Sequence, residues 1–382
     1  MDFAWTPEQL ALKKSAITFA ETLLKDNEAA REGVGTFPRD AWRRCAEYGI
    51  QGMAVPSSIP SGRGTDFLDA MLVMEGLGYG CRDNGLAFAL NAQMWTVQLP
   101  IVHHGSEEQK RKYLPGMCDG SLIGAHAVTE PDAGSDAFSM RTRAQKCDGG
   151  YLLSGVKRYI SLAPVADLIL VFASIDPELG RWGITAFLVD RGSPGLQFGP
   201  EREKMGLRTV PMGDLTFDEC FVPTANRLGA EGAGLRLSTT SLDWERCCIL
   251  ASQLGAMQRQ LETACGYART RKQFGQQIGK FQSVANRVVD MKLRLETSRL
   301  MLYQVAWLKR EGRDAMMESA MLKLHLSECF LASSTDAIRV HGALGYMSEN
   351  GVERDLRDAV GGTIYAGTSD IQRNVIAALL GL

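Results

Sequence analysis

The spacing of hydrophobic positions divides the chain into three parts. Over the first ~120 residues, apolar side chains recur every three or four positions, which predicts amphipathic helices at residues 10–24, 38–48, 66–79 and 106–114. Thr6 and Pro7 are a helix start signal, because threonine caps helix N-termini and proline fits the first helical position. A loop rich in glycine, serine and proline is expected at residues 56–64.

The second part, which begins near residue 124, alternates short β-prone runs with turn residues. Strands are predicted at residues 141–146, 151–154, 168–173, 183–189 and 214–217. Asp148-Gly149 between the first two is typical of a hairpin turn. These features favour a compact antiparallel β-domain.

The helical period returns after Gly234. Apolar series run from Leu250 to Ala268 and from Val284 to Val305, and a third helix is expected at residues 314–339. A fourth helix is expected to begin at Ser369, where Ser369 and Gln372 match a capping box. The predicted fold is therefore α+β and multidomain: an N-terminal helical domain (residues 1–122), a middle antiparallel β-domain (123–232) and a C-terminal four-helix bundle (233–382).

Composition narrows the possible functions. The net charge of −2 gives no basic field for nucleic acid, and no run of 18 apolar residues predicts a membrane span. The segment Met1–Glu8 lacks a basic region followed by an apolar stretch, so no signal peptide is expected. The nine cysteines contain no CxxC pair, and the five histidines form no metal-ligand pattern. A reduced cytoplasmic protein without a metal site is expected.

Five segments carry candidate chemistry. They are His126–Asp136, Lys157–Ser161, Arg271–Gln282, Ile338–Tyr346 and Ile364–Arg373. Each alone also fits an ordinary surface turn, a strand aromatic or a solvated helix end. Their order and separations, however, match the signatures of the acyl-CoA dehydrogenase superfamily, which the whole chain resembles.

The resemblance implies that the chain binds FAD. On the flavin side it implies contacts from His126, Val128, Thr129, Ser135, Tyr159, Ser161, Thr368 and Asp370. On the adenosine and diphosphate side, it implies contacts to the FAD of a partner subunit from Arg271, Gln273, Phe274, Phe281, Gln282, Arg339 and Ala343. Three positions depart from the common pattern. Tyr159 stands where tryptophan is more usual, Arg339 where glutamine is common, and Ala343 where glycine is common.

The catalytic base is expected at an alternative position. Ala366 stands where many members of the superfamily keep the catalytic glutamate, whereas Glu245 matches the second base position, used by isovaleryl- and long-chain-type members. Glu245 alone would be interpreted as a solvated acid in a helix. The loss at 366 together with the acid at 245 predicts a relocated base. Substrate contacts are implied for Ser135, Asp243, Arg246, Ala366 and Gly367, with the Ala366 N–H holding the thioester oxygen.

The expected reaction is FAD-dependent α,β-dehydrogenation of an acyl thioester, in which hydride passes to flavin N5. Residues 164–168, 176–180, 244–247 and 376–382 resemble biosynthetic dehydrogenases that act on prolyl groups tethered to carrier proteins. A CoA thioester and a carrier-protein thioester both remain open as substrates. The expected acceptor is an electron-transfer flavoprotein or dioxygen, and the expected assembly is a homodimer or homotetramer. The alternatives are a flavin oxidase of the same fold and a catalytically silent protein that binds acyl thioesters.

Overall fold

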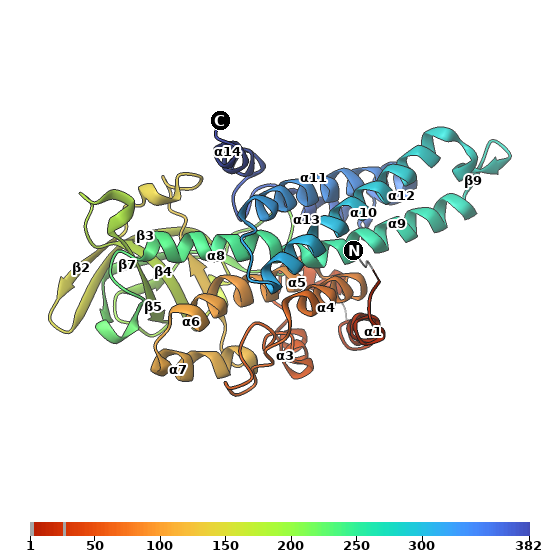
Figure 1. Ribbon diagram of the computed structural model, residues 1–382. Coiled ribbons are helices and arrows are strands. Elements are labelled where there is room, and N and C mark those ends of the chain that lie inside the picture. Colours follow the sequence, from red (N-terminus) through yellow and green to blue (C-terminus); the bar gives the residue numbers. More distant parts are fainter. Residues whose placement is uncertain (1–3, 26–27) are drawn as a thin grey trace.

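The computed structural model describes residues 4–25 and 28–382. Helices, a β-sheet and a second set of helices follow one another along the chain (Figure 1). The sheet lies at one end of the molecule and the tip of the C-terminal helices at the other, with α8 (Gly234–Cys248) running from the sheet towards the middle (Figure 1). This arrangement confirms the predicted fold class. Residues 1–3, part of the segment for which no signal peptide is predicted, lie outside the described residues.

The N-terminal part begins as predicted. Thr6 Oγ1 accepts from the N–H of Gln9, and the Gln9 side chain accepts from the Thr6 N–H, both at 3.2 Å, which caps the first helix. Periodicity missed residues 84–104, because helices that are apolar on every side show no distinct face. The elements are α1 (Pro7–Leu23), α2 (Glu28–Val34), α3 (Arg39–Tyr48), α4 (Phe67–Gly80), α5 (Asn84–Gln93), the π-helix η1 (Met94–Gln98), α6 (Leu99–His104) and α7 (Glu107–Cys118).

The middle part is one sheet with the order β6-β7-β3-β2-β4-β5-β8, and β1 pairs with β4. Most neighbours are antiparallel; β1 and β2 run parallel to β4. The Asp148-Gly149 turn joins β2 to β3 as predicted, with Cys147 opposite Gly150. The strands are β1 (Gly124–Ala127), β2 (Arg143–Cys147), β3 (Gly150–Ser161), β4 (Leu168–Ser174), β5 (Ile184–Asp190), β6 (Leu196–Phe198), β7 (Met212–Pro223) and β8 (Arg227–Leu228).

The C-terminal helices are α8, α9 (Ala251–Thr270), α10 (Gln282–Arg310), α11 (Met316–His341), α12 (Ala343–Tyr346), α13 (Val352–Gly362) and α14 (Ser369–Leu379). A short hairpin, β9 (Lys272–Gln273) and β10 (Gln276–Gln277), joins α9 to α10 at the tip. The expected Ser369/Gln372 capping box is wrong. Thr368 caps α14 instead, because the Ser369 hydroxyl donates to Glu328 at 2.6 Å. Helix α13 was not predicted.

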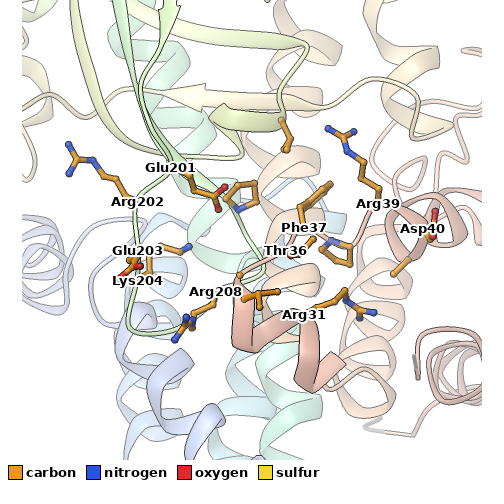
Figure 2. Close-up of a pocket in the computed structure, with 16 residues that line it drawn as sticks. Arg31, Thr36, Phe37, Arg39, Asp40, Glu201, Arg202, Glu203, Lys204 and Arg208 are labelled. Atoms are coloured by element: carbon orange, nitrogen blue, oxygen red, sulfur yellow. The ribbon is translucent and has the colours of Figure 1, made fainter. Parts of the chain in front are cut away.

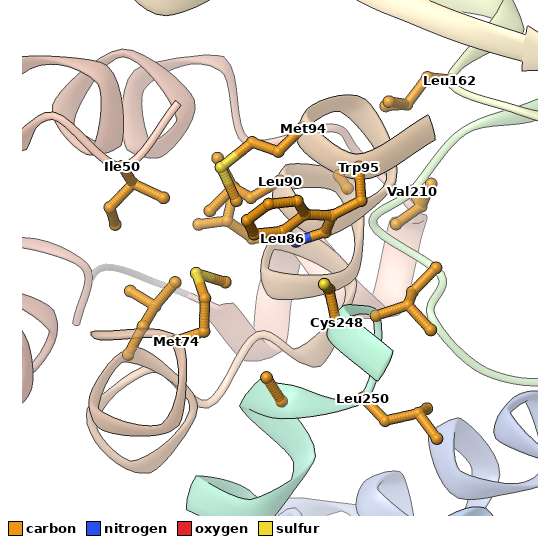
Figure 3. Packing of buried hydrophobic residues seen from close by; sticks show 14 of the residues in the cluster. Ile50, Met74, Leu86, Leu90, Met94, Trp95, Leu162, Val210, Cys248 and Leu250 are labelled. Atoms are coloured by element: carbon orange, nitrogen blue, oxygen red, sulfur yellow. The ribbon is translucent and has the colours of Figure 1, made fainter. Parts of the chain in front are cut away.

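Tight packing joins the three parts. Trp95 of η1 belongs to one buried cluster with Leu162 and Val210 of the β-domain and with Cys248 and Leu250 at the α8–α9 junction (Figure 3). This cluster holds the C-terminal end of α8 between the sheet and the N-terminal helices. Apolar burial of this kind is the main stabilising contribution to the fold.

Helices α4 and α9 approach each other so closely that only glycine fits at the crossing. A Cβ at Gly78 would lie 1.8 Å from the Ser252 carbonyl oxygen, and one at Gly255 would lie 2.1 Å from the Glu75 carbonyl oxygen. Both distances are shorter than any contact between non-bonded atoms. The N-terminal helices and the C-terminal bundle therefore share one continuous core.

Within residues 4–25 and 28–382, no helix combines the length and the apolar character needed to cross a membrane. None of the nine cysteines, all of which the structure describes, forms a disulfide, and seven of them are buried.

Candidate active site

Helix α8 presents the predicted base to the interior. Glu245 is partly buried near the C-terminal end of α8, and this helix packs on η1, β5 and α11. No hydrogen bond to its carboxylate is found among the described residues. Burial raises the pKa of Glu245 to about 7, while the positive charges of Arg246 and Lys323 act in the opposite direction. An acid with this pKa can take up and release a proton near neutral pH.

The segment with the substituted residue lies between α13 and α14. Ala366 and Gly367 both have left-handed backbones, with φ of 56° and 84°. Gln372 Nε2 donates to the carbonyl oxygens of Ala366 at 3.0 Å and Gly367 at 3.1 Å. The Ala366 N–H has no hydrogen-bond partner within the described part of the chain. Because the neighbouring carbonyls are fixed, this donor is held in one orientation.

Lys323 of α11 connects this segment to the base. Its side chain is fully buried, and its Nζ donates to the Gly367 carbonyl oxygen at 2.6 Å. Burial lowers the pKa of Lys323 to about 8, opposed by the negative charges of Glu245 and Glu328, while Arg246 adds to the lowering. A buried ammonium group needs a nearby negative charge. Glu245 and Lys323 therefore influence each other's protonation.

The other predicted substrate residues of α8 have separate surroundings. Asp243 forms an ion pair with Lys309 of α10, and the Lys309 Nζ lies 4.4 Å from the centre of the Trp244 ring. Arg246 is buried, and its Nε has no partner within the described residues. Burial lowers the pKa of Arg246, and the charges of Glu245 and Asp243 oppose this effect. Arg246 thus offers an unused donor beside the base.

Predicted flavin-side residues follow strand β1. His126 at its end packs edge-on against Phe172, and its Nε2 is buried without a partner in the described structure. Burial, reinforced by the charge of Lys157, lowers the pKa of His126 to about 4, so the ring is neutral at pH 7. Two hydrogen bonds from β3 fix the backbone of the residues that follow β1, Val128 and Thr129. Lys157 Nζ donates to the Val128 carbonyl oxygen at 2.9 Å, and the Arg158 N–H donates to the Thr129 carbonyl oxygen at 2.8 Å.

Lys157 itself is anchored by Glu130. The two form a buried ion pair at 2.8 Å, and Glu130 also accepts from the Thr142 N–H at 3.0 Å. Burial lowers the pKa of Lys157 to about 8, while Glu130 opposes this change. The pair fixes the loop after β1 to strand β3.

Tyr159 and Ser161 lie at the end of β3, beside that loop. Tyr159 sits at a β-bulge with φ of 59°, and its side chain is 53% exposed. Its N–H donates to Asp214 at 3.2 Å. Ser161 is half-buried, and Ser135 is exposed in the loop that precedes β2. At the start of α14, Thr368 is engaged as the cap and Asp370 is exposed and paired with Arg373.

The predicted residues for the adenosine and diphosphate meet in one pocket at the tip. This tip pocket has a volume of about 740 Å³. Phe274 at the turn of the hairpin is 94% exposed. The lining includes six of the seven residues predicted for this side of the cofactor: Arg271, Gln273, Phe274, Phe281, Arg339 and Ala343. The seventh, Gln282, begins α10 directly after Phe281.

Strand β3, which carries Tyr159 and Ser161, lies at the opposite end of the molecule from the tip pocket, whereas Thr368 and Asp370 stand at the start of α14. Strands β2, β3 and β7 are at one end, whereas the β9 hairpin is at the other (Figure 1). One chain therefore does not bring both groups together.

A second groove lies near the segment that follows β6. It has a volume of about 750 Å³ between α2–α3 and the segment 201–211 (Figure 2). Arg31, Arg39, Arg202, Lys204 and Arg208 line it, together with the carboxylates of Asp40, Glu201 and Glu203. A neighbouring hollow of about 510 Å³ joins residues 200–204 to Tyr159.

Sequence reasoning missed two site residues, Lys157 and Lys323. Both lysines are fully buried, and a charged residue that is fully buried needs a specific partner. The sequence alone gave no signal for this burial, because exposed or half-buried residues lie beside both lysines.

Comparisons with known proteins cover the whole chain. Three family models match: "Acyl-CoA dehydrogenase, N-terminal domain" at residues 6–121, "middle domain" at 125–220 and "C-terminal domain" at 232–381. An L-prolyl-[peptidyl-carrier protein] dehydrogenase of a Serratia species is 41% identical over 100% of this chain and 99% of its own length.

Solved structures agree with these matches. The prolyl acyl carrier protein oxidase AnaB is 46% identical, with a TM-score of 0.98 over 99% of this chain and 100% of that one. PigA with FAD and proline is 40% identical, with a TM-score of 0.97 and complete coverage of both chains.

Proposed function

Because this chain belongs to the acyl-CoA dehydrogenase family, we propose that it is a FAD-dependent dehydrogenase of a prolyl or related acyl group held as a thioester on a carrier protein. The observation that carries this proposal is the partly buried Glu245, whose pKa of about 7 suits proton abstraction beside the Ala366 segment. The similarity to the Serratia enzyme and to PigA supports the substrate class.

The residues present fit FAD. The unpartnered buried His126 Nε2, the exposed Tyr159 ring and the arginine-containing tip pocket offer polar, stacking and anion-binding groups. His126, Val128, Thr129, Ser135, Tyr159, Ser161, Thr368 and Asp370 would hold the flavin end. Arg271, Gln273, Phe274, Phe281, Gln282, Arg339 and Ala343 would hold the adenosine and diphosphate end. When bound, FAD supplies the acceptor for the hydride that leaves Cβ.

Glu245 takes the proton from Cα of the acyl group. It must be ionised to do so, and near neutral pH about half of its carboxyl groups are ionised. An α-proton is weakly acidic, so the negative charge that develops on the thioester oxygen needs hydrogen-bond donors. The N–H of Ala366 is one such donor. Gln372 and Lys323 hold the carbonyl groups of Ala366 and Gly367, which follow this N–H in the chain, and thereby keep it in place.

Loss of a carboxylate at Ala366 leaves this step intact, since any residue except proline supplies the same N–H. Ser135, Asp243, Arg246 and Gly367 would complete the substrate contacts. Arg246, with its unused Nε, would bind an oxygen of the substrate or steady the Glu245 carboxylate.

We also propose that two copies of the chain form each complete cofactor site, as a homodimer or within a homotetramer. The support is the separation of the two groups of cofactor residues (Figure 1). A cytoplasmic location is proposed because none of the nine cysteines forms a disulfide, and disulfides are rare in reducing compartments.

The test is anaerobic mixing of the flavin-loaded protein with a prolyl-loaded carrier protein, with prolyl-CoA and with straight-chain acyl-CoAs. Fast bleaching of the flavin absorbance by the loaded carrier protein is expected. Bleaching by an acyl-CoA but not by the loaded carrier protein would show that the substrate is a CoA thioester and contradict the proposal. If no thioester bleaches the flavin, the protein is a catalytically silent binding protein.

One alternative is an oxidase, in which the electrons taken from the substrate pass to dioxygen. The similarity to AnaB, which is called an oxidase, favours it. Oxygen consumption during turnover decides between the two. A dehydrogenase consumes little oxygen and needs an electron-transfer flavoprotein or an equivalent acceptor, whereas an oxidase consumes one molecule of dioxygen for each two-electron oxidation.

A further inference from the structure

A small polar pocket lies where α9, α11 and the start of α13 meet, outside the residues assigned to substrate or cofactor. Its volume is about 80 Å³, and three arginines line it: Arg82, Arg259 and Arg354. His341, on its wall, also lines the tip pocket, so the two pockets are neighbours.

Arg354 is the least expected of these residues. It is only 9% exposed, and within the described residues no carboxylate or carbonyl oxygen bonds to its guanidinium group. The guanidinium folds back over the start of α13, because a Cβ built on Gly351 would lie 2.9 Å from Arg354 Nη2. The guanidinium nitrogens are open to the pocket, and no counter-charge bonds to them within the described residues. A largely buried arginine with an unbalanced charge favours an anion as its partner.

The other charges in the pocket leave that need unmet. Arg259 Nη1 donates to three carbonyl oxygens of residues 78–81, and its Nη2 lies 3.6 Å from Asp355. Asp355 also accepts from Asn84 at 2.8 Å, so its single charge is already shared. Arg82 is exposed and has no ion pair in the described structure. Three arginines against one carboxylate leave an excess of two positive charges.

The start of α13 adds N–H donors and further positive charge to the pocket wall. Gly351, the N-cap, has φ of 67° and no side chain to cap the helix, which extends over 11 residues from Val352. Its first N–H groups and the positive end of its dipole therefore lie at the pocket wall, where they favour a bound anion.

We propose that this pocket binds one tetrahedral oxyanion with two negative charges, either free phosphate or the phosphate group of a larger molecule. Its size suits a single phosphate group, and its excess of two positive charges matches a dianion. Arg354 and the α13 N-terminus hold the oxyanion from one side and Arg82 from the other. The bound anion would tie the end of α4 and α9 to the start of α13, next to the tip pocket.

The experiment titrates inorganic phosphate into the flavin-loaded protein in buffer without phosphate or sulfate. Calorimetry measures affinity, and thermal unfolding measures the gain in stability. The variants are Arg354→Gln and Arg82→Gln, and the matched control is Arg143→Gln, an exposed arginine of β2 at the other end of the molecule. Wild type and control should each bind one phosphate and unfold at a higher temperature with it.

Arg354→Gln should weaken phosphate binding at least about tenfold, because it removes a charge-assisted hydrogen bond. It should not lower the unfolding temperature in anion-free buffer, since it removes a positive charge that has no partner in the described structure. A lower unfolding temperature there, with no gain from phosphate in the wild type, would make Arg354 a structural residue and overturn the proposal. Equal phosphate affinity of wild type and Arg354→Gln would overturn it as well.

A parallel titration with adenosine monophosphate separates the two sources of the anion. If Arg354-dependent binding of the nucleotide is tighter than that of phosphate, the ligand is the phosphate group of a larger molecule. If phosphate binds at least as tightly, the ligand is the free ion. The readouts are independent of activity, so they stand whatever the substrate of the enzyme.

Discussion

Replacing Lys323 by glutamine removes a buried positive charge but keeps an N–H group that can still donate to the Gly367 carbonyl oxygen. The structure makes Lys323 one of two cations that lower the pKa of Glu245 against the effect of burial. Without that charge, the pKa of Glu245 rises further above its value of about 7. A rise of about one unit is expected, at the lower end of what a nearby opposite charge produces.

The consequence for catalysis follows from the ionised fraction of the base. Glu245 abstracts a proton only when ionised, so the rate of flavin reduction should increase with pH through its pKa. For a pKa of about 7, the ionised fraction grows about tenfold between roughly pH 6 and pH 8, whereas an acid with an ordinary pKa would already be ionised throughout. In Lys323→Gln the midpoint moves up by about one unit, and the rate at about pH 6.5 falls roughly eightfold.

The assay is stopped-flow flavin reduction at saturating substrate without oxygen, measured across pH for wild type, Lys323→Gln and Lys323→Arg. Lys323→Arg keeps the charge and should keep the wild-type midpoint. A Lys323→Gln profile that coincides with wild type would show that this charge does not act on the base. A wild-type rate that is flat across this range would remove Glu245 from the proton-transfer step.

Three further predictions concern the base, the tip and the core. Glu245→Gln should retain bound FAD, seen by its absorbance, yet slow flavin reduction by about 100- to 10,000-fold; normal reduction would place the base elsewhere. Arg271→Gln should lose FAD on desalting, because a paired donor to the diphosphate is missing, and unchanged retention would exclude that role. Glu75→Ala should lower the free energy of unfolding, measured in urea, by about 3–5 kcal/mol, because it leaves the charges of Lys13 and Arg299 without their carboxylate partner in the α1–α4–α10 interface. A loss below about 1 kcal/mol would contradict this reasoning.

Local patterns predicted much of the fold. The cap at Thr6, the Asp148-Gly149 hairpin and the amphipathic helices could all be derived from the sequence because the stabilising contacts lie within a few residues. The failures have long-range causes. Ser369 matches a cap motif, but its hydroxyl bonds to Glu328 of another helix, and Thr368 takes over the capping.

The site divides in the same way. The order of the sequence motifs correctly grouped the six tip-pocket residues. These residues lie in two short segments, the α9–α10 turn and the end of α11, which meet in the structure. The roles of Lys157 and Lys323 depend on partners 27 and 44 residues away, Glu130 and Gly367, and no local pattern encodes such contacts. The predicted roles of the individual site residues stay predictions until the variants are measured.

The placement of β3 and the tip pocket at opposite ends of the molecule leads to a genetic prediction. If each complete site borrows one half from a neighbour, a variant damaged at the hairpin and a variant damaged near β3 are defective in different halves. Mixed assemblies of the two inactive proteins would contain one undamaged site built from their intact halves. Co-expression of the two alleles should therefore restore activity that neither allele has alone.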